Sequence, residues 1–168
     1  MFKDLKLLPV YKTGENDIPK EFYNPILKCA IKYDRTSAYF SAQALSMYSE
    51  GLEYFSSRKC KYRLIISHDI DEDTYSEIKK GYDLRKSVSE ELVDLLNEKL
   101  SDREEMNLSN LAYFIANGTV EIKIAFKTKG IFHDKCGLME DEKEMLFVFE
   151  DQIMRLKQLF QRTMNLFS

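Results

Sequence analysis

Two side chains that can act on a phosphate, His133 and Lys135, stand two residues apart in the sequence. On a β-strand, residues at this spacing point to the same face of the sheet. An imidazole can attack phosphorus and form a covalent intermediate, and an ammonium group can bind the anionic oxygens. If this stretch is a strand, the pair is suited to attack on a phosphate diester.

Further lysines lie close to this pair in the sequence: Lys123, Lys127 and Lys129. Two interpretations fit them. They form a patch that faces phosphate groups, or they lie on an ordinary solvated strand face and loop.

Length and composition are those of an ordinary globular domain. The 168 residues are 44% hydrophobic and 32% charged, which predicts one domain whose core needs neither disulfides nor metal. The net charge of −3 argues against a protein that coats nucleic acid non-specifically, because such proteins are usually basic.

Cysteine usage and hydropathy indicate the compartment. Cys29, Cys60 and Cys136 are odd in number and lack Cys-x-x-Cys spacing, so we expect three reduced thiols. No apolar run has membrane-spanning length, and the N-terminus lacks the apolar core of a signal peptide. We therefore expect a cytoplasmic protein with no membrane partner.

Hydrophobic spacing predicts alternating helices and strands. The clearest strand covers 120–127, where apolar residues occupy every second position. The other expected elements are a helix over 19–33, a strand over 36–41, a helix over 45–57, a strand over 62–66, helices over 71–82, 88–100 and 108–115, and a strand through His133. This order predicts an α/β fold in which a mixed β-sheet is flanked by crossover helices.

Three stretches of the chain carry a resemblance to a known family. They are Ser-Ala-Tyr-Phe-Ser at 37–41 followed by Gly51 and Leu52, Lys-Tyr-Arg-Leu-Ile-Ile-Ser at 61–67, and His-Asp-Lys-Cys-Gly-Leu-Met-Glu-Asp at 133–141. With them, residues 33–143 resemble a phospholipase D-like (HKD motif) phosphodiesterase domain. The similar branch stands at the N-terminus of bacterial helicase-type and restriction or phage-defence proteins.

The resemblance implies a two-step phosphoryl transfer that needs no metal or cofactor. In it, His133 would be the nucleophile or the acid and Lys135 would bind the phosphate, while Asp141 or Glu140 would orient the imidazole. Because the chain holds one copy of the motif, a complete site would need two chains, and we expect a homodimer. DNA as the substrate, and a fused or separate helicase as a partner, follow from the resemblance alone.

The family motif continues into Gly-Ser-x-Asn, which helps to bind the phosphate, and this chain has no such element. Codons for residues 144–156 can be chosen so that one G inserted before them changes the reading frame. The shifted frame then encodes Gly-Asn-Val-Val-Cys-Phe-Arg-Gly-Ser-Asn-Asn-Glu-Thr. That frame restores the missing element where the family has it. Our hypothesis is a single-base deletion after Lys143, which makes 1–143 an incomplete domain and 144–168 an out-of-frame tail.

A genuine amphipathic helix is the other interpretation of the tail. Its apolar residues fall on one helical face: Phe149, Ile153, Leu156, Phe160, Met164 and Phe167. The two interpretations are compatible, because an out-of-frame tail can still fold and pack or drive association. The expected fold is therefore a C-terminally truncated phospholipase D-like domain with an atypical helical tail.

Other residues admit both a functional and a structural interpretation. His68 could be a second acid or, beside Asp69 and Asp71, a metal ligand, but we favour a loop whose aspartates cap a helix. Tyr39 and Phe40 could stack on bases, but on a buried strand we expect both in the core.

The sequence thus predicts a phosphodiesterase, expected to be a DNA-directed nuclease of a bacterial restriction, defence or helicase system. Without the serine and asparagine donors, this chain should have weak activity or none. The alternative is a catalytically inactive remnant of the fold, or a DNA- or protein-interaction module that acts by dimerisation.

Overall fold

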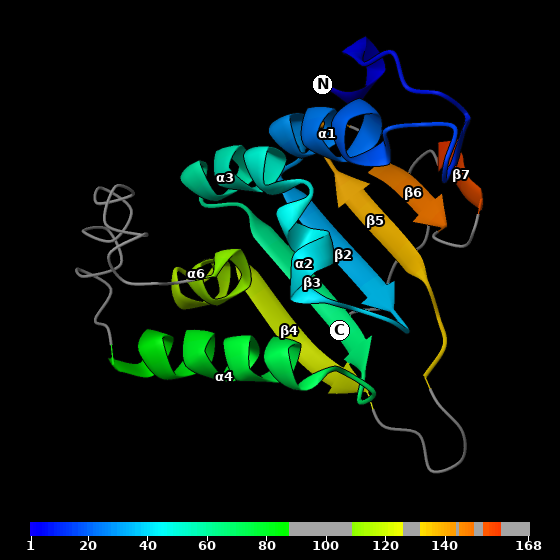
Figure 1. The fold of residues 1–168 in the computed structure, drawn as a ribbon. Coiled ribbons are helices and arrows are strands. Elements are labelled where there is room, and N and C mark those ends of the chain that lie inside the picture. The colour runs from blue at the N-terminus through cyan, green and yellow to red at the C-terminus, as the bar shows by residue number, and fades with distance from the viewer. Residues whose placement is uncertain (88–108, 126–131, 144, 150–152, 159–168) are drawn as a thin grey trace.

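The computed structural model describes residues 1–87, 109–125, 132–143, 145–149 and 153–158 (Figure 1). The helix predicted over 88–100 lies outside these residues. In chain order the elements are η1 (Phe2–Asp4), β1 (Val10–Lys12), η2 (Pro19–Tyr23), α1 (Asn24–Cys29), β2 (Lys32–Ser37), α2 (Ala42–Ser46), α3 (Ser49–Ser57), β3 (Lys61–Ser67), α4 (Glu72–Ser87), α6 (Asn110–Ala116), β4 (Val120–Ala125), β5 (Cys136–Glu140), β6 (Met145–Phe149) and β7 (Ile153–Gln158).

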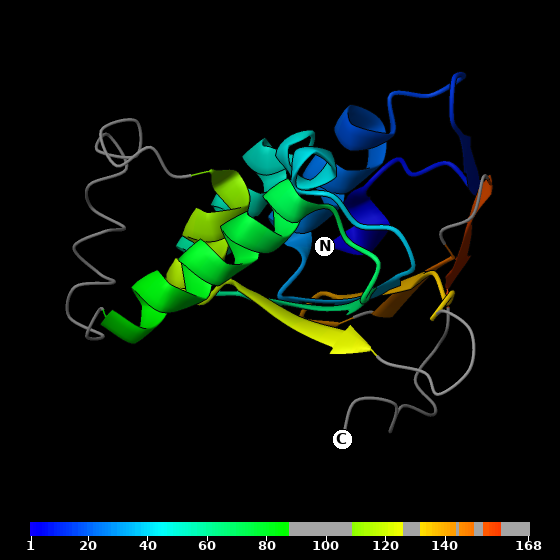
Figure 2. The same cartoon turned by 60° about the horizontal axis from the view of Figure 1, so that its bottom comes forward.

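Within the described residues, seven strands form one mixed sheet in the order β1-β7-β6-β5-β2-β3-β4. β2, β3 and β4 run parallel, whereas β5 is antiparallel to β2, and β6, β7 and β1 continue the antiparallel part. The labelled α-helices cover one face of this sheet, as Figure 2 shows. The predicted α/β class, with a mixed sheet and flanking helices, is confirmed. No helix in the described ranges combines the length and apolarity that crossing a bilayer requires.

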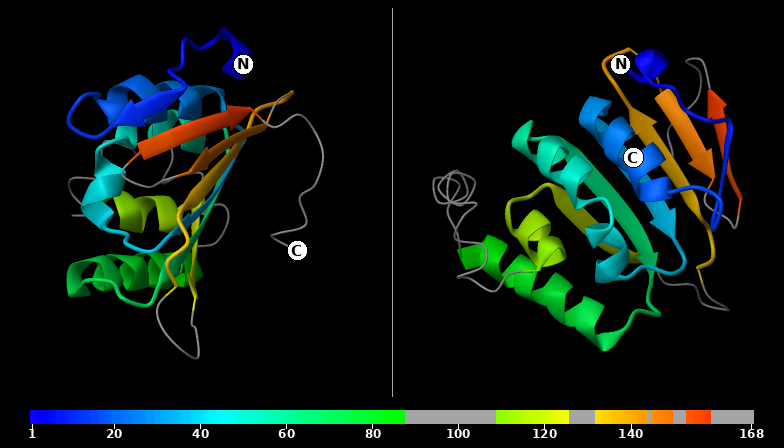
Figure 3. Two further views of the ribbon diagram at one scale, coloured as in Figure 1. Left: turned by 90° about the vertical axis from the view of Figure 1, so that its right-hand side faces the viewer. Right: turned by 45° about the horizontal axis from the view of Figure 1, so that its top comes forward.

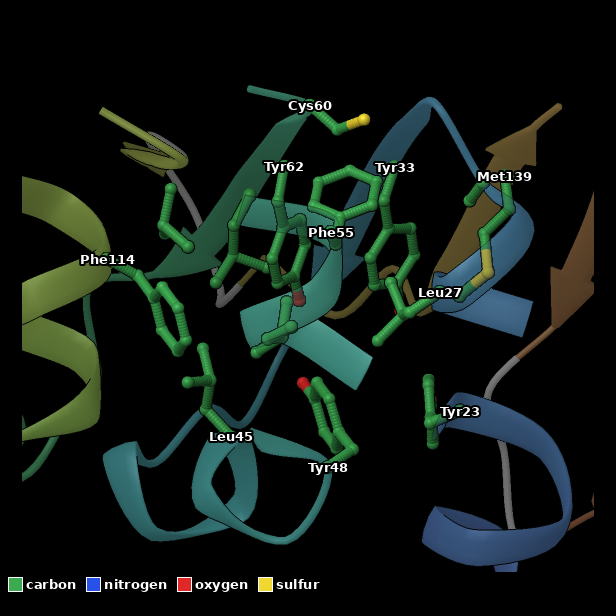
Figure 4. Packing of buried hydrophobic residues seen from close by; sticks show 14 of the residues in the cluster. Tyr23, Leu27, Tyr33, Leu45, Tyr48, Phe55, Cys60, Tyr62, Phe114 and Met139 are labelled. Carbon is green, nitrogen blue, oxygen red and sulfur yellow. The ribbon is translucent and has the colours of Figure 1, made fainter. Parts of the chain in front are cut away.

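The core lies between the sheet and the helices, around two stacked tyrosines (Figure 4). Tyr33 of β2 and Tyr62 of β3 are register partners, and their rings stack with 4.3 Å between centroids and 14° between planes. Leu27 of α1 and Phe55 of α3 are buried in the same cluster. Each such buried side chain contributes about 1.5–3 kcal/mol relative to exposure, so this cluster holds α1 and α3 on the sheet.

The N-terminal boundaries differ from those predicted. The predicted helix over 19–33 divides into the π-helix η2 and α1, which ends at Cys29, and the strand predicted over 36–41 is β2, Lys32–Ser37. Pro25 is tolerated because it stands in the first turn of α1, where its missing N–H is not needed. β2 begins at Lys32 and ends at Ser37 because these residues pair with β3 on one side and, as far as Thr36, with β5 on the other. The spacing of apolar residues along the sequence does not reveal this pairing.

α4 and α6 form largely where the sequence predicts them. Ser109 caps α6 by accepting a hydrogen bond from the backbone N of Ala112, and Gly118, with φ of +77°, follows the last turn. The Tyr82 hydroxyl of α4 accepts from the backbone N of Ile122 at 2.8 Å and donates to its carbonyl at 3.1 Å. These two bonds satisfy outward-facing backbone groups of the edge strand β4.

The described part of the tail is not helical. β6 and β7 extend the sheet beyond β5, and β1 from the N-terminus pairs with β7 (Figure 3). The predicted helical tail is therefore wrong for 145–149 and 153–158, whereas Phe160, Met164 and Phe167 lie outside the described residues. The physical reason is the backbone of β5, whose second edge needs hydrogen-bond partners that a helix cannot supply. The aromatic and β-branched residues of β6 suit that pairing.

Candidate active site

His133 and Lys135 lie in the segment that leads into β5, which begins at Cys136. Their predicted placement on a strand of the sheet is wrong. The physical reason is that the ladder with β2 starts at the pair Thr36–Cys136, so the described residues 132–135 lie before the strand. Since β5 is antiparallel to β2, this segment meets the carboxyl ends of the parallel strands. Open α/β sheets bind ligands at that edge.

Tyr39, on the loop after β2, contacts both members of the pair. Its ring meets the His133 imidazole edge to face, with 5.8 Å between centroids and 86° between planes. The Nζ atom of Lys135 lies 5.6 Å from the centroid of the same ring, within cation–π range. The tertiary fold therefore brings the imidazole and the ammonium group to one aromatic ring without a shared strand.

Hydrogen bonds hold the two segments that meet in this cluster. The Thr36 Oγ1 atom accepts from the backbone N of Cys136 at 3.0 Å, directly after Lys135. The Ser37 hydroxyl donates to the carbonyl oxygen of Tyr39 at 2.8 Å. Both bonds come from the last two residues of β2, so the end of this strand fixes the position of Tyr39 beside residues 133–135.

Asp141 and Glu140 do not orient the imidazole of His133, contrary to the prediction. The whole of β5, at about 3.3 Å per residue, lies between His133 and these two acids. The buried Asp141 carboxylate accepts from the backbone N of Phe2 at 2.6 Å and of Lys143 at 2.8 Å. It therefore joins the N-terminal segment to the end of β5, and its role in this chain is structural.

Glu140 is engaged at the same distant end of β5. Its carboxylate lies 3.9 Å from the ammonium group of Lys32, which also pairs with the buried Asp34 at 3.3 Å. Asp34 in turn receives two hydrogen bonds from the Arg63 guanidinium, and these bonds raise the pKa of Arg63. This network crosses three strands and is structural in position.

The loop after β3 caps α4, as favoured from the sequence. Asp71 accepts from the backbone N and the hydroxyl of Thr74, each at 2.8 Å, and these bonds hold the pKa of Asp71 below its ordinary value. The Thr74 hydroxyl also accepts from the backbone N of Ala42 at 3.2 Å, which ties the Tyr39 loop to α4. Within the described ranges, no three His, Cys, Asp or Glu side chains are grouped to hold a metal.

The charges near the pair are mixed. Asp134 is exposed between His133 and Lys135, and Lys123 is exposed on β4. Lys127 and Lys129 lie outside the described residues, so the structure does not bear on their part in a phosphate-facing patch. Among the described lysines, Lys135 is the one that shares an aromatic contact with His133.

Tyr39 is the functional candidate that the sequence interpretation placed wrongly. Phe40 is 7% exposed, as predicted for a core residue, but Tyr39 is 61% exposed. β2 ends at Ser37, so Tyr39 lies on a loop and not on a buried strand. The informative pattern was the alternation itself, because Ala38 and Phe40 face inward and Tyr39 between them faces outward.

No protein-family model matches the chain, and no curated protein matches its sequence. The resemblance to phospholipase D-like domains therefore rests on the three stretches quoted above. Chemically, the cluster offers an exposed imidazole for nucleophilic or proton-transfer chemistry and an ammonium group for an anion. The exposed side chain of Tyr39 adds an aromatic surface beside them.

Proposed function

We propose that the chain is a phospholipase D-like phosphodiesterase domain that acts on DNA through a phosphohistidine intermediate. The observation that carries the proposal is the meeting of His133 and Lys135 at one ring, at the carboxyl edge of a mixed α/β sheet. The HKD-like stretch supplies the residue types, and the fold class agrees with the resemblance. DNA as the substrate, and a bacterial restriction, defence or helicase system as the setting, enter through the resemblance alone.

In the proposed reaction, an imidazole nitrogen of His133 attacks phosphorus. A P–N bond forms, the P–O bond to the leaving strand breaks, and a second histidine gives its proton to the leaving oxygen. Water then attacks phosphorus and passes a proton to that second histidine, and the P–N bond breaks. The ammonium group of Lys135 neutralises the charge on the non-bridging oxygens in both steps, so the proposed mechanism needs no metal ion at phosphorus.

The second histidine comes from a second copy of the chain. His68, the other histidine, follows β3 in a loop whose neighbour Asp71 caps α4, and the HKD-like stretch occurs once. A homodimer that brings two His133 imidazoles into one cleft supplies both the nucleophile and the acid. The test uses the version whose reading frame after Lys143 is restored, mixed in equal amount with its own His133→Ala variant and allowed to exchange subunits. If both histidines are required, the mixture keeps about a quarter of the activity of the unmutated version at the same total concentration, against about half for independent sites.

Weak activity is expected of this chain, because Gly-Ser-x-Asn is missing from its sequence. Loss of hydrogen-bond donors to the transition state costs about 10²–10³ in rate for each donor. The proposed activity therefore belongs to the fold with that element restored. The chain itself retains the imidazole and the ammonium group, and with them the capacity to bind a phosphate diester.

Hydrolysis of bis-nitrophenyl phosphate in EDTA tests the proposal. We compare this chain with a version whose reading frame after Lys143 is restored, each with and without His133→Ala. The restored version should hydrolyse the diester, this chain weakly or not at all, and His133→Ala should abolish turnover. Hydrolysis that requires a divalent cation, or that survives His133→Ala, contradicts the mechanism. Inactivity of both versions favours the catalytically inactive interaction module.

A further inference from the structure

We infer that Tyr39 is a stacking platform for an unpaired DNA base whose phosphate lies at His133 and Lys135. The inference rests on the proposed function, which supplies the nucleic-acid substrate, and it names the substrate class as single-stranded or locally unpaired DNA. It is carried by the position of one ring, which is exposed to solvent and in contact with both phosphate-directed side chains.

The exposure of Tyr39 is imposed by the fold. Its neighbours Ala38 and Phe40 are buried, so the loop is anchored on both sides of the exposed ring. The carbonyl of Tyr39 accepts from the Ser37 hydroxyl, and the backbone N of Ala42, where the loop ends and α2 begins, donates to the Thr74 hydroxyl. An aromatic ring held outward by its own backbone loses little conformational freedom when a flat ligand stacks on it.

The groups around the ring match the parts of a nucleotide. A nucleotide joins an aromatic base to a phosphate through a sugar, and here an exposed ring lies beside an imidazole and an ammonium group. Stacking accepts any base, because every base has a π-face, and the cation binds the backbone. A simple phosphate would need the cation alone, so the ring favours a nucleic-acid ligand.

An unpaired strand fits this arrangement better than a duplex. In a duplex the bases are stacked on each other and point inward, so an external ring cannot lie flat on one of them. In a single strand the bases are free to turn outward and stack on an aromatic side chain. Preference for the single strand is therefore the property that separates a stacking site from a purely electrostatic one.

Tyr54 of α3 provides a matched control. It is 50% exposed, and the Arg58 guanidinium lies 5.1 Å from its ring centroid, so it too is an exposed tyrosine with a cation beside it. It lies on the helix that leads into the amino end of β3, at the other end of that strand from the candidate site. A general effect of losing a surface tyrosine would appear in Tyr54→Leu as well.

Fluorescence anisotropy in EDTA at one fixed salt concentration tests the inference, with a labelled short oligothymidylate and a labelled duplex of the same length. The parent should bind the single strand more tightly. Tyr39→Leu should weaken that binding about 5- to 150-fold, the range that stacking of one base implies, and leave duplex binding unchanged. Tyr39→Phe and Tyr54→Leu should bind like the parent. Lys135→Ala should weaken the binding of both the single strand and the duplex. It should also reduce the slope of log affinity against log salt concentration by about one, the value for one phosphate contact.

A second readout observes stacking directly on the parent chain. A fluorescent purine analogue within the oligonucleotide should be quenched on binding, because stacking on an aromatic ring quenches its emission, and Tyr39→Leu should remove the quenching. Unchanged single-strand affinity in Tyr39→Leu, an equal loss for duplex, or no quenching with the parent would overturn the inference.

The two proposals fail differently. If Tyr39-dependent binding is observed but no version of the chain hydrolyses a diester, the phosphodiesterase proposal fails and the stacking site stands. If hydrolysis depends on His133 while Tyr39→Leu binds and cleaves oligonucleotides like the parent, the stacking inference fails alone.

Discussion

The ammonium group of Lys135 lies over the ring of Tyr39, 5.6 Å from its centroid, at the end of β2. Tyr39 follows a parallel strand and Lys135 precedes an antiparallel one, so the contact joins the two halves of the mixed sheet. An exposed cation–π pair of this kind is worth about 0.5–1 kcal/mol. It therefore orients the lysine while leaving its charge able to bind an anion.

Lys135 should matter for turnover through charge at phosphorus. In the frame-restored chain, Lys135→Ala should lower diester hydrolysis about 10²–10³-fold, the usual cost of losing one group that stabilises developing charge. Free imidazole should restore part of the activity to His133→Ala but none to Lys135→Ala. Lys123→Ala, at an exposed position of β4, is the control and should leave the rate unchanged. Equal losses in Lys123→Ala and Lys135→Ala would argue for a diffuse basic patch instead.

Asp141 should contribute to stability and not to chemistry. Its carboxylate is 3% exposed and accepts two backbone N–H groups, those of Phe2 and Lys143. Asp141→Ala leaves both donors without this acceptor and should reduce the free energy of unfolding by about 1–3 kcal/mol for each donor that stays buried. Urea denaturation measures the loss. If Asp141→Ala instead changed the pH dependence of hydrolysis by the frame-restored version, Asp141 would have the predicted role of orienting the His133 imidazole.

Gly51 should be intolerant of any side chain, because α3 packs closely on α1 at this position. A Cβ atom on Gly51 would lie 2.9 Å from the Cα atom of Asn24, and the backbone N of Gly51 donates to the Asn24 side chain at 2.8 Å. Gly51→Ala should destabilise the fold by about 1–3 kcal/mol through overpacking. Ser57→Ala, on the exposed side of the same helix, is the control for helix propensity. Equal unfolding midpoints for parent and Gly51→Ala would contradict the close packing.

Asp71 should make stability depend on pH. Its hydrogen bonds to Thr74 lower the pKa of the carboxyl group in the folded state, so the unfolded chain binds the proton more readily. The stabilisation is complete above the unfolded pKa, near pH 4, and is lost as the pH falls through the lower folded value. Asp71→Ala should thus lower the urea midpoint at neutral pH and converge with the parent in acid. Asp69→Ala, in the same loop, should follow the parent, and a constant difference for Asp71→Ala across pH would refute the capping charge.

The gene should carry the missing motif in a neighbouring frame. Codons for the tail can be chosen so that the frame containing Gly-Ser-Asn-Asn stays open through to the codon of Phe167. Sequencing the nucleotides after the Lys143 codon decides the matter directly. Codons that cannot yield Gly-Ser-x-Asn after one inserted base would dispose of the frameshift hypothesis, and β6 and β7 would then be native strands of this chain.

Local sequence patterns were sufficient for much of the architecture. The alternation in β4, the apolar run of β3 and the capping residue Asp71 all predicted elements that the structure contains. Such features are local, because a period or a cap is decided by residues within a few positions of each other. The residue types of the HKD-like stretch were likewise readable without coordinates.

The remaining features required the tertiary fold. The apolar spacing in the tail predicted a helix, but 145–149 and 153–158 form strands. The edge of β5 provides backbone hydrogen-bond partners for β6, and no local sequence pattern predicts such partners. The distance of Asp141 from His133 followed from where β5 begins and ends. The contact of Tyr39 with His133 and Lys135 arose only when the strand order placed β5 beside β2. The sequence determined which side chains are available for chemistry, and the pairing of distant strands decided which of them meet, because the hydrogen bonds of a sheet join residues without regard to their separation along the chain.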